Sequence, residues 1–168
     1  MIHPSRQASA LLGLHTNATF YRDSLFWLFL ALGPVVWTLM AGFVQLQPLP
    51  WFQVWSPALL SLVFWQPVIE ELLFRGVIQG CLLHTAWGQK RLGYLSLANL
   101  VTSVAFSLAH MASHLLVWSI LVLAPSLAFG ILRERYDSVY PPIALHVFYN
   151  VGYFLLAGGG ALQGYSMK

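Results

Sequence analysis

Two carboxylates stand side by side in a strongly apolar stretch of the chain, Gln66-Pro67-Val68-Ile69-Glu70-Glu71-Leu72-Leu73-Phe74-Arg75-Gly76. Apolar residues continue on both sides, and they predict a helix over about residues 57–83. Ser56 and Pro57 form a typical helix start, because serine caps the first turn and proline fits the first helical position. Since about 20 apolar residues cross a bilayer, the stretch predicts a membrane-spanning helix that carries ionisable groups.

The composition of the whole chain agrees with a membrane protein. Of its 168 residues, 58% are hydrophobic and 8% are charged, and the mean hydropathy is +0.70. So few charges exclude a water-soluble globule, and so many apolar residues exclude a disordered chain. The formal net charge is +3, but the basic residues form no stripe interleaved with aromatic residues. We therefore expect the lipid bilayer as a partner and no nucleic acid.

Four further apolar runs are long enough for spanning helices, and a charged stretch separates the last two. The predicted fold class is all-α, a polytopic transmembrane helix bundle with about five spans. The charged residues 133–137 predict a loop, and Gly158 to Gly160 predict the end of the last helix. Single Cys81 excludes an intrachain disulfide, and its apolar neighbours favour a buried position. The further helices are expected at about residues 25–44, 94–112, 115–132 and 140–158.

The basic residues also predict how the bundle is oriented. If the N-terminus is cytoplasmic, the cytoplasmic segments hold six basic residues and the outer segments hold one. Cytoplasmic loops of membrane proteins carry an excess of Lys and Arg, so this orientation is favoured. The six are Arg6, Arg22, Lys90, Arg91, Arg133 and Arg135, and the outer one is Lys168.

The ionisable groups inside the predicted spans require an explanation. A charge at the centre of a spanning helix costs about 2.5–3.5 kcal/mol on insertion scales. Glu71 and Arg75 are four residues apart, share a helix face and can pair, whereas Glu70 points about 100° away. By itself the pair could be a structural ion-pair lock. Pro67 removes one backbone hydrogen bond just before the glutamates and could loosen that turn.

Two other predicted helices carry polar groups as well. His110 ends Phe106-Ser107-Leu108-Ala109-His110, and His114 could share its face. His146 and Asn150 are separated by one helical turn and share a face of the last helix. Burying these groups separately would leave several unsatisfied, so we expect one shared polar pocket that contains water. Helical rise places Glu70 about 21 Å along its helix and His110 about 24 Å along the next, nearer the outer face.

At these residues the chain resembles the CAAX prenyl protease and bacteriocin-processing family of intramembrane peptidases, also called Abi proteins. The family pattern is Glu-Glu-x-x-x-Arg, then Phe-x-x-x-His, then His-x-x-x-Asn. The resemblance covers about residues 66–153 and includes all three motifs in order. The matching residues are Glu70, Glu71 and Arg75; Phe106 and His110; His146 and Asn150.

The resemblance implies a glutamic-type intramembrane endopeptidase. It would hydrolyse a peptide bond near the terminus of a membrane-associated protein or peptide. Glu70, helped by His110, would polarise a water molecule, while His146 and Asn150 would donate hydrogen bonds to the developing oxyanion. Glu71, Arg75 and Phe106 would support the site. The substrate could be a prenylated C-terminus, a membrane-sorting tail or a bacteriocin-like leader.

The resemblance also divides the chain and sets its expected location. Residues 1–24 form a cytoplasmic N-terminal segment, residues 25–158 the membrane-embedded peptidase domain and residues 159–168 a short C-terminal tail. The short chain is of bacterial type, so we expect an integral protein of a bacterial inner (cell) membrane. The sequence leaves the oligomeric state open.

Two alternatives compete with this reading. The glutamate and histidines could bind zinc, but the chain has no His-Glu-x-x-His pattern, so no cofactor and no metal are expected. A second class is non-catalytic: a membrane scaffold, an immunity protein, or a proton or ion path through the buried Glu and His residues. All seven motif positions are intact, which favours the peptidase.

Overall fold

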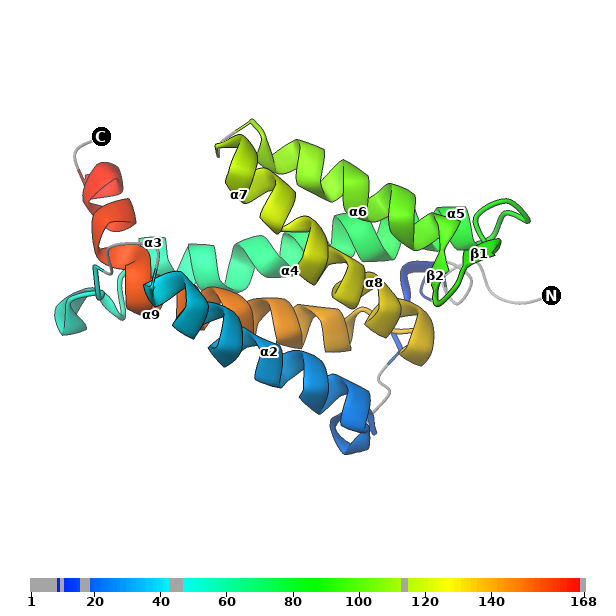
Figure 1. Cartoon of the computed structure of the whole chain (residues 1–168), viewed down its shortest axis with the longest axis horizontal. Helices are drawn as coiled ribbons and strands as arrows, with labels where there is room; N and C mark the ends of the chain where they lie inside the picture. The colour runs from blue at the N-terminus through cyan, green and yellow to red at the C-terminus, as the bar shows by residue number, and fades with distance from the viewer. Residues whose placement is uncertain (1–8, 10, 16–18, 43–46, 113–114, 167–168) are drawn as a thin grey trace. The chain divides into compact units, whose positions relative to one another are not determined.

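The fold is helical apart from one short hairpin. A computed structural model describes residues 9, 11–15, 19–42, 47–112 and 115–166 (Figure 1). Within these residues, the expectation of an all-α chain is confirmed except for the two-residue strands β1 and β2, which pair antiparallel. The elements are η1 (Phe20–Arg22), α2 (Ser24–Ala41), η2 (Trp51–Gln53), α3 (Pro57–Leu60), η3 (Ser61–Trp65), α4 (Gln66–Glu71), η4 (Leu72–Gln79), α5 (Gly80–Leu83), β1 (Arg91–Leu92), β2 (Leu95–Ser96), α6 (Leu97–His110), α7 (Leu116–Leu121), α8 (Leu123–Tyr136) and α9 (Tyr140–Ser166).

The helix that carries the glutamates begins and ends where the sequence predicts. It runs without interruption from Pro57 to Leu83, and the Ser56 hydroxyl accepts a hydrogen bond from the Leu59 N–H at 3.2 Å. The winding alternates along it, since η3 and η4 are π-helical and α3, α4 and α5 are α-helical. Departures from α-winding are frequent at functional sites, and here they flank the glutamate pair on both sides.

Two helices among the described residues are long and apolar enough to cross a membrane. They are Pro57–Leu83, with 27 residues, and Leu116–Tyr136, with 21 residues. The helices α2 and α6 are also apolar but shorter. The helical positions thus follow the predicted spans, whereas the number of spans stays a prediction.

The chain forms two compact units. The first contains Met1–Phe20 and Glu70–Ile143, and the second contains Tyr21–Ile69 and Ala144–Lys168. In the first unit α6 packs against α8 and η4, and α8 packs against η4 (Figure 1). Gly130 of α8 allows the closest approach, because an added Cβ there would overlap the Asn99 side chain of α6. The first unit is therefore a three-helix packing centred on polar as well as apolar contacts.

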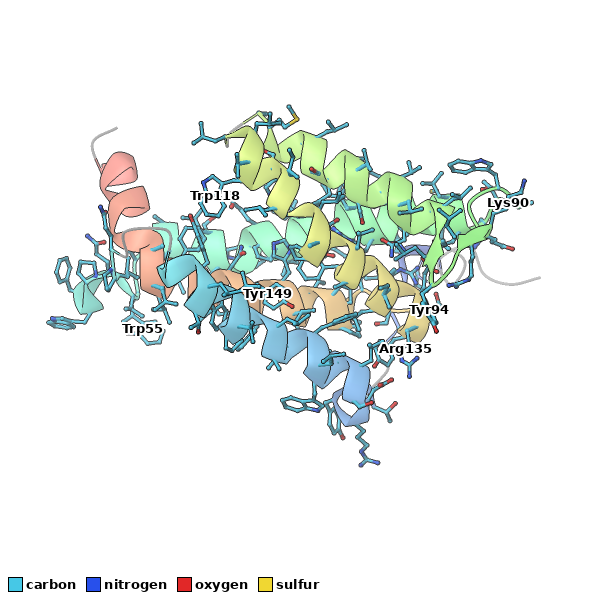
Figure 2. The ribbon with its side chains drawn as sticks, in the orientation of Figure 1. Trp55, Lys90, Tyr94, Trp118, Arg135 and Tyr149 are labelled. Atoms are coloured by element: carbon cyan, nitrogen blue, oxygen red, sulfur yellow. The ribbon has the colours of Figure 1, made fainter. Side chains whose placement is uncertain are left out.

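The second unit has its own apolar core. Leu49, Leu59, Leu62 and Val63 form a buried cluster, and apolar residues of α9 pack against it. Two aromatic contacts hold α2 to α9: the Trp37 and Phe148 rings lie 5.1 Å apart, and the Tyr149 hydroxyl donates to the Phe29 carbonyl (Figure 2). The core of this unit thus depends on α9 from residue 144 onward.

Three of the predicted boundaries are wrong. The third helix begins at Leu97 rather than residue 94, because β1 and β2 occupy the preceding residues. The fourth continues to Tyr136 rather than ending at residue 132, and it has a turn at Val122 shortly before Pro125, which has no N–H to donate. The last helix continues to Ser166, past the glycines that predicted its end. Of the first predicted helix, residues 43 and 44 lie outside the described residues.

Two further predictions are wrong: the burial of Cys81 and the loop at residues 133–137. Cys81, in α5, is exposed rather than buried. The charged residues 133–137 do not form a loop: α8 continues to Tyr136, and Asp137 ends it in the left-handed region with φ 48°. Arg133 is only 2% exposed and donates to the Arg75 carbonyl, the Leu11 carbonyl and the Asp137 carboxylate. Charge density predicted a loop, but the guanidinium finds enough acceptors to be buried.

We expect Arg133→Met to destabilise the protein by about 3 kcal/mol, because the buried Arg75 carbonyl and the partly buried Leu11 carbonyl lose a charged donor. Arg135 is the matched control, since it is exposed at the end of the same helix (Figure 2). Arg135→Met should change stability by no more than about 0.5 kcal/mol. Thermal unfolding in detergent measures both, and equal losses would contradict the assignment.

Candidate active site

Glu71 and Arg75 form the buried ion pair that their spacing predicts. The Arg75 Nη1 donates to Glu71 Oε1 at 3.1 Å, and both side chains are fully buried. The Arg75 Nη2 also donates to the Ser126 carbonyl at 2.9 Å and to its hydroxyl at 2.6 Å. These bonds tie the helix of the glutamates to α8, so the pair acts between helices as well as within one.

Aromatic rings enclose the rest of the guanidinium. The Arg75 Cζ lies 4.7 Å from the Phe106 ring centroid and 5.2 Å from that of Phe129. A planar cation over an aromatic face is stabilised by the ring quadrupole, and more so where water is excluded. Phe106, which the resemblance gives only as a supporting residue, therefore has a specific contact: it holds Arg75 from the side of α6.

A series of hydrogen-bonded polar side chains lies further along the same helix, and no motif in the sequence predicted it. Gln79 Nε2 donates to the Gly130 carbonyl at 3.1 Å and to Glu134 Oε1 at 3.0 Å. Ser96 donates to the same carboxylate oxygen, and Arg91 Nη2 donates to Glu134 Oε2 at 3.0 Å. One signal was available, because Gln79 follows Arg75 by one helical turn and so shares the face of the ion pair.

The contacts of the first unit also set the level of His110 relative to the glutamates. Ser96 and Gln79 both bind Glu134, whereas the Phe106 and Phe74 rings lie 5.0 Å apart. The helix α6 and the helix of the glutamates are therefore antiparallel. The residue one helical turn after Phe106 is then expected at the same height as the residue one turn before Phe74.

Helical rise from this ring contact then predicts that His110 lies near the level of Glu70 and Glu71. The later start of the third helix, at Leu97, reduces the offset in depth expected between His110 and Glu70. Glu70 is partly buried, as is His110. The first unit thus holds a carboxylate and an imidazole on the same pair of helices.

The His110 ring is oriented by its own helix. Its Nδ1 lies 2.9 Å from the Phe106 carbonyl, and its ring lies 4.4 Å from the Phe106 ring. A carbonyl oxygen only accepts, so this bond assigns the proton of a neutral imidazole to Nδ1. In that tautomer Nε2 is the acceptor nitrogen of the ring. His114, expected on the same face, lies outside the described residues.

The remaining two predicted residues belong to the second unit. His146 is 7% exposed, and Asn150 Nδ2 donates to the Leu62 carbonyl at 3.0 Å. They lie one turn apart on α9, as predicted. Five predicted site residues therefore lie in the first unit, namely Glu70, Glu71, Arg75, Phe106 and His110, and two in the second, His146 and Asn150.

Within the part of the chain that the structure describes, no three His, Cys, Asp or Glu side chains are grouped as a metal site would require. The side chains that are grouped fit other chemistry. A carboxyl group and an imidazole on neighbouring helices can exchange a proton with a water molecule. A buried arginine beside them adds a fixed positive charge.

Comparison with known proteins gives one match. A family model described as type II CAAX prenyl endopeptidase Rce1-like matches residues 50–152. The matched residues cover more than half of the chain and include every predicted site residue. No curated protein and no solved structure matches the chain. The resemblance deduced from the three motifs is confirmed.

We expect Arg75→Met to cost about 3–5 kcal/mol of stability, because it leaves the Glu71 carboxylate buried without its cation. Arg75→Lys should recover less than half of that loss, since an ammonium group cannot reach Ser126 and both rings at once. Arg91→Lys, at a half-exposed ion pair, serves as the control and should cost no more than about 0.5 kcal/mol. Thermal unfolding in detergent measures all three, and full recovery by lysine would refute the planar contact.

Proposed function

The chain belongs to the type II CAAX prenyl endopeptidase Rce1-like family, a family of membrane-embedded proteases, and on this premise we propose that it is a glutamic-type intramembrane endopeptidase. Its substrate is a membrane-associated protein or peptide, cut near a terminus. The observations that support the proposal are the Phe74–Phe106 and Arg75–Phe106 contacts, because they hold the helix of His110 against the helix of Glu70.

Glu70 and His110 activate the attacking water. In the proposed step, the water oxygen attacks the scissile carbonyl carbon while its proton passes to Glu70 or to Nε2 of His110. The hydrogen bond from Nδ1 to the Phe106 carbonyl supports this, because it fixes the tautomer in which Nε2 accepts. The same proton is then donated to the leaving amine, so the acid and the base are restored after each turnover.

From the family motif, we propose that His146 and Asn150 donate hydrogen bonds to the oxyanion. Each carries an N–H group that can donate to the negative oxygen, and preorganised donors of this kind typically account for 10²–10³ in rate. Glu71 and Arg75 keep their helix attached to α8 and place a positive charge near Glu70. Arg75 and Glu71 are thus positioning residues.

Hydrolysis proceeds without a metal ion in this proposal. A zinc protease of the His-Glu-x-x-His type holds its metal with two histidines one turn apart on one helix, and the chain has no such motif. The zinc alternative remains distinguishable by experiment. Chelation should leave the rate of peptide cleavage unchanged, and a loss that stoichiometric zinc restores would show that the site is metal-dependent.

The bundle crosses the membrane five times with its N-terminus in the cytoplasm. Contacts within the first unit support this, because they join three segments that the basic residues assign to the cytoplasmic side. Arg133 binds the Leu11 carbonyl, and Arg91 binds Glu134. Segments in contact at one end of a bundle lie on one side of a membrane. Arg6 and Lys168, also used in that assignment, lie outside the described residues.

We expect Glu70→Gln and His110→Gln to lower kcat at least 100-fold while the protein still folds, because each removes a proton acceptor. His84→Gln is a matched control: His84 Nδ1 lies 2.8 Å from the Gly80 carbonyl, in the same local geometry as His110. Its kcat should stay within about twofold of the wild type. Cleavage of a membrane-tethered peptide by purified protein gives the rates, and full turnover by Glu70→Gln would refute the mechanism.

We expect Lys90→Cys and Trp55→Cys, each in a Cys81→Ser background, to react with a membrane-impermeant maleimide from opposite sides of the membrane. One predicted span separates the two positions, and both side chains are exposed (Figure 2). Lys90→Cys should label from the cytoplasmic side, in inverted vesicles. Labelling of both from one side would contradict the five-span arrangement.

A further inference from the structure

The helix of the glutamates has a break in its hydrogen bonding shortly before Glu70. At the end of η3, the Gln66 N–H donates to the Ser61 carbonyl, which is five residues back. In α-helical winding the same N–H would donate to the Leu62 carbonyl. In π-helical winding the donor for Leu62 would be the next residue, but that residue is Pro67, which has no N–H. Neither winding therefore supplies a backbone donor to the Leu62 carbonyl.

A side chain supplies this donor. Asn150 Nδ2 of α9 donates to the Leu62 carbonyl at 3.0 Å, and both residues belong to the second unit. Leu62 is buried, at 9% exposed, within the apolar cluster that packs against Val147 and Val151 of α9. A buried carbonyl in such surroundings is costly without a donor, so the amide answers a specific requirement of this helix.

We infer that Asn150 is a positioning residue that supplies the hydrogen bond withheld by Pro67. It fixes the π-helical register of η3, and with it the rotation of the helical turn that leads to Glu70. A change of one residue in register rotates the following side chains by about 100°. The amide has two N–H groups, and this role uses one of them. The consequence for catalysis rests on the proposed function, whereas the hydrogen bond does not.

A double-mutant cycle between Asn150 and Pro67 tests the inference through stability. Asn150→Leu should lower the Tm in detergent by about 4–8 °C, because the Leu62 carbonyl loses its donor. Pro67→Ala restores a backbone N–H, so in that background the same substitution should cost less than half as much. Equal losses in the two backgrounds would overturn the inference.

Tyr149→Phe is the matched control for this cycle. It removes a hydrogen bond from the adjacent residue of α9, to the Phe29 carbonyl of α2. Its Tm loss should be the same with and without Pro67→Ala. Rescue of Tyr149→Phe as well would show that Pro67→Ala stabilises the chain in general, and it would overturn the assignment. If Asn150→Leu does not fold, Asn150→Ala, which is smaller and also lacks the donor, replaces it.

Turnover separates a positioning role from a purely structural one. If Asn150 sets the rotation of Glu70, the double variant Asn150→Leu/Pro67→Ala should have a kcat at least tenfold above that of Asn150→Leu, with little change in KM. Recovery of Tm without recovery of kcat would overturn the positioning role. If no variant and not even the wild type cleaves peptides, the proposed function fails, but the thermal cycle still decides the hydrogen bond.

Discussion

The buried guanidinium of Arg75 is the constraint on which the first unit depends. A cation without access to water must meet an anion, hydrogen-bond acceptors or aromatic faces, and Arg75 meets all three. Glu71 comes from its own helix, Ser126 from α8 and Phe106 from α6. Each of these helices is thereby fixed in translation as well as in rotation, because a guanidinium plane accepts few arrangements of partners.

The level of His110 follows from the same constraint. Phe106 lies over Arg75 and beside His110, so the position of the cation fixes how far α6 extends past the glutamates. In this way a structural ion pair determines whether an imidazole and a carboxylate stand at one level. The polar groups from Gln79 to Arg91 extend the same interface to exposed surface, and they hold the hairpin of β1 and β2 against α8.

The sequence predicts those features that depend on neighbours along the chain. The start of the long helix at Pro57 and the pair of Glu71 with Arg75 are local, through a cap and an i,i+4 spacing, and both are correct. The burial of Arg133 and the late start of α6 depend on partners distant in sequence. Leu11 and Arg75 accept from Arg133, and Glu134 binds Ser96, so no pattern near residue 133 reveals them.

The same distinction, between local and long-range features, applies to the site residues. Motif spacing correctly places Glu71 with Arg75 on one face and His146 with Asn150 one turn apart. It could not reveal that Asn150 has a backbone partner, because the lack of a donor for Leu62 arises from π-winding and proline together. It could not give the start of the third helix either, since β1 and β2 occupy the residues that precede Leu97.

The contacts that N-terminal residues make within the first unit have a consequence for biosynthesis. Leu11 accepts from Arg133, which follows it by 122 residues, and the Gly13 carbonyl accepts from the Val139 N–H. Gly80 leaves space for the Leu11 backbone that a larger residue would fill. Because a ribosome releases the chain from its N-terminus, this early segment has to wait until residues 133–139 have been synthesised before its partners exist. Closure of the first unit is thus a late event of membrane insertion.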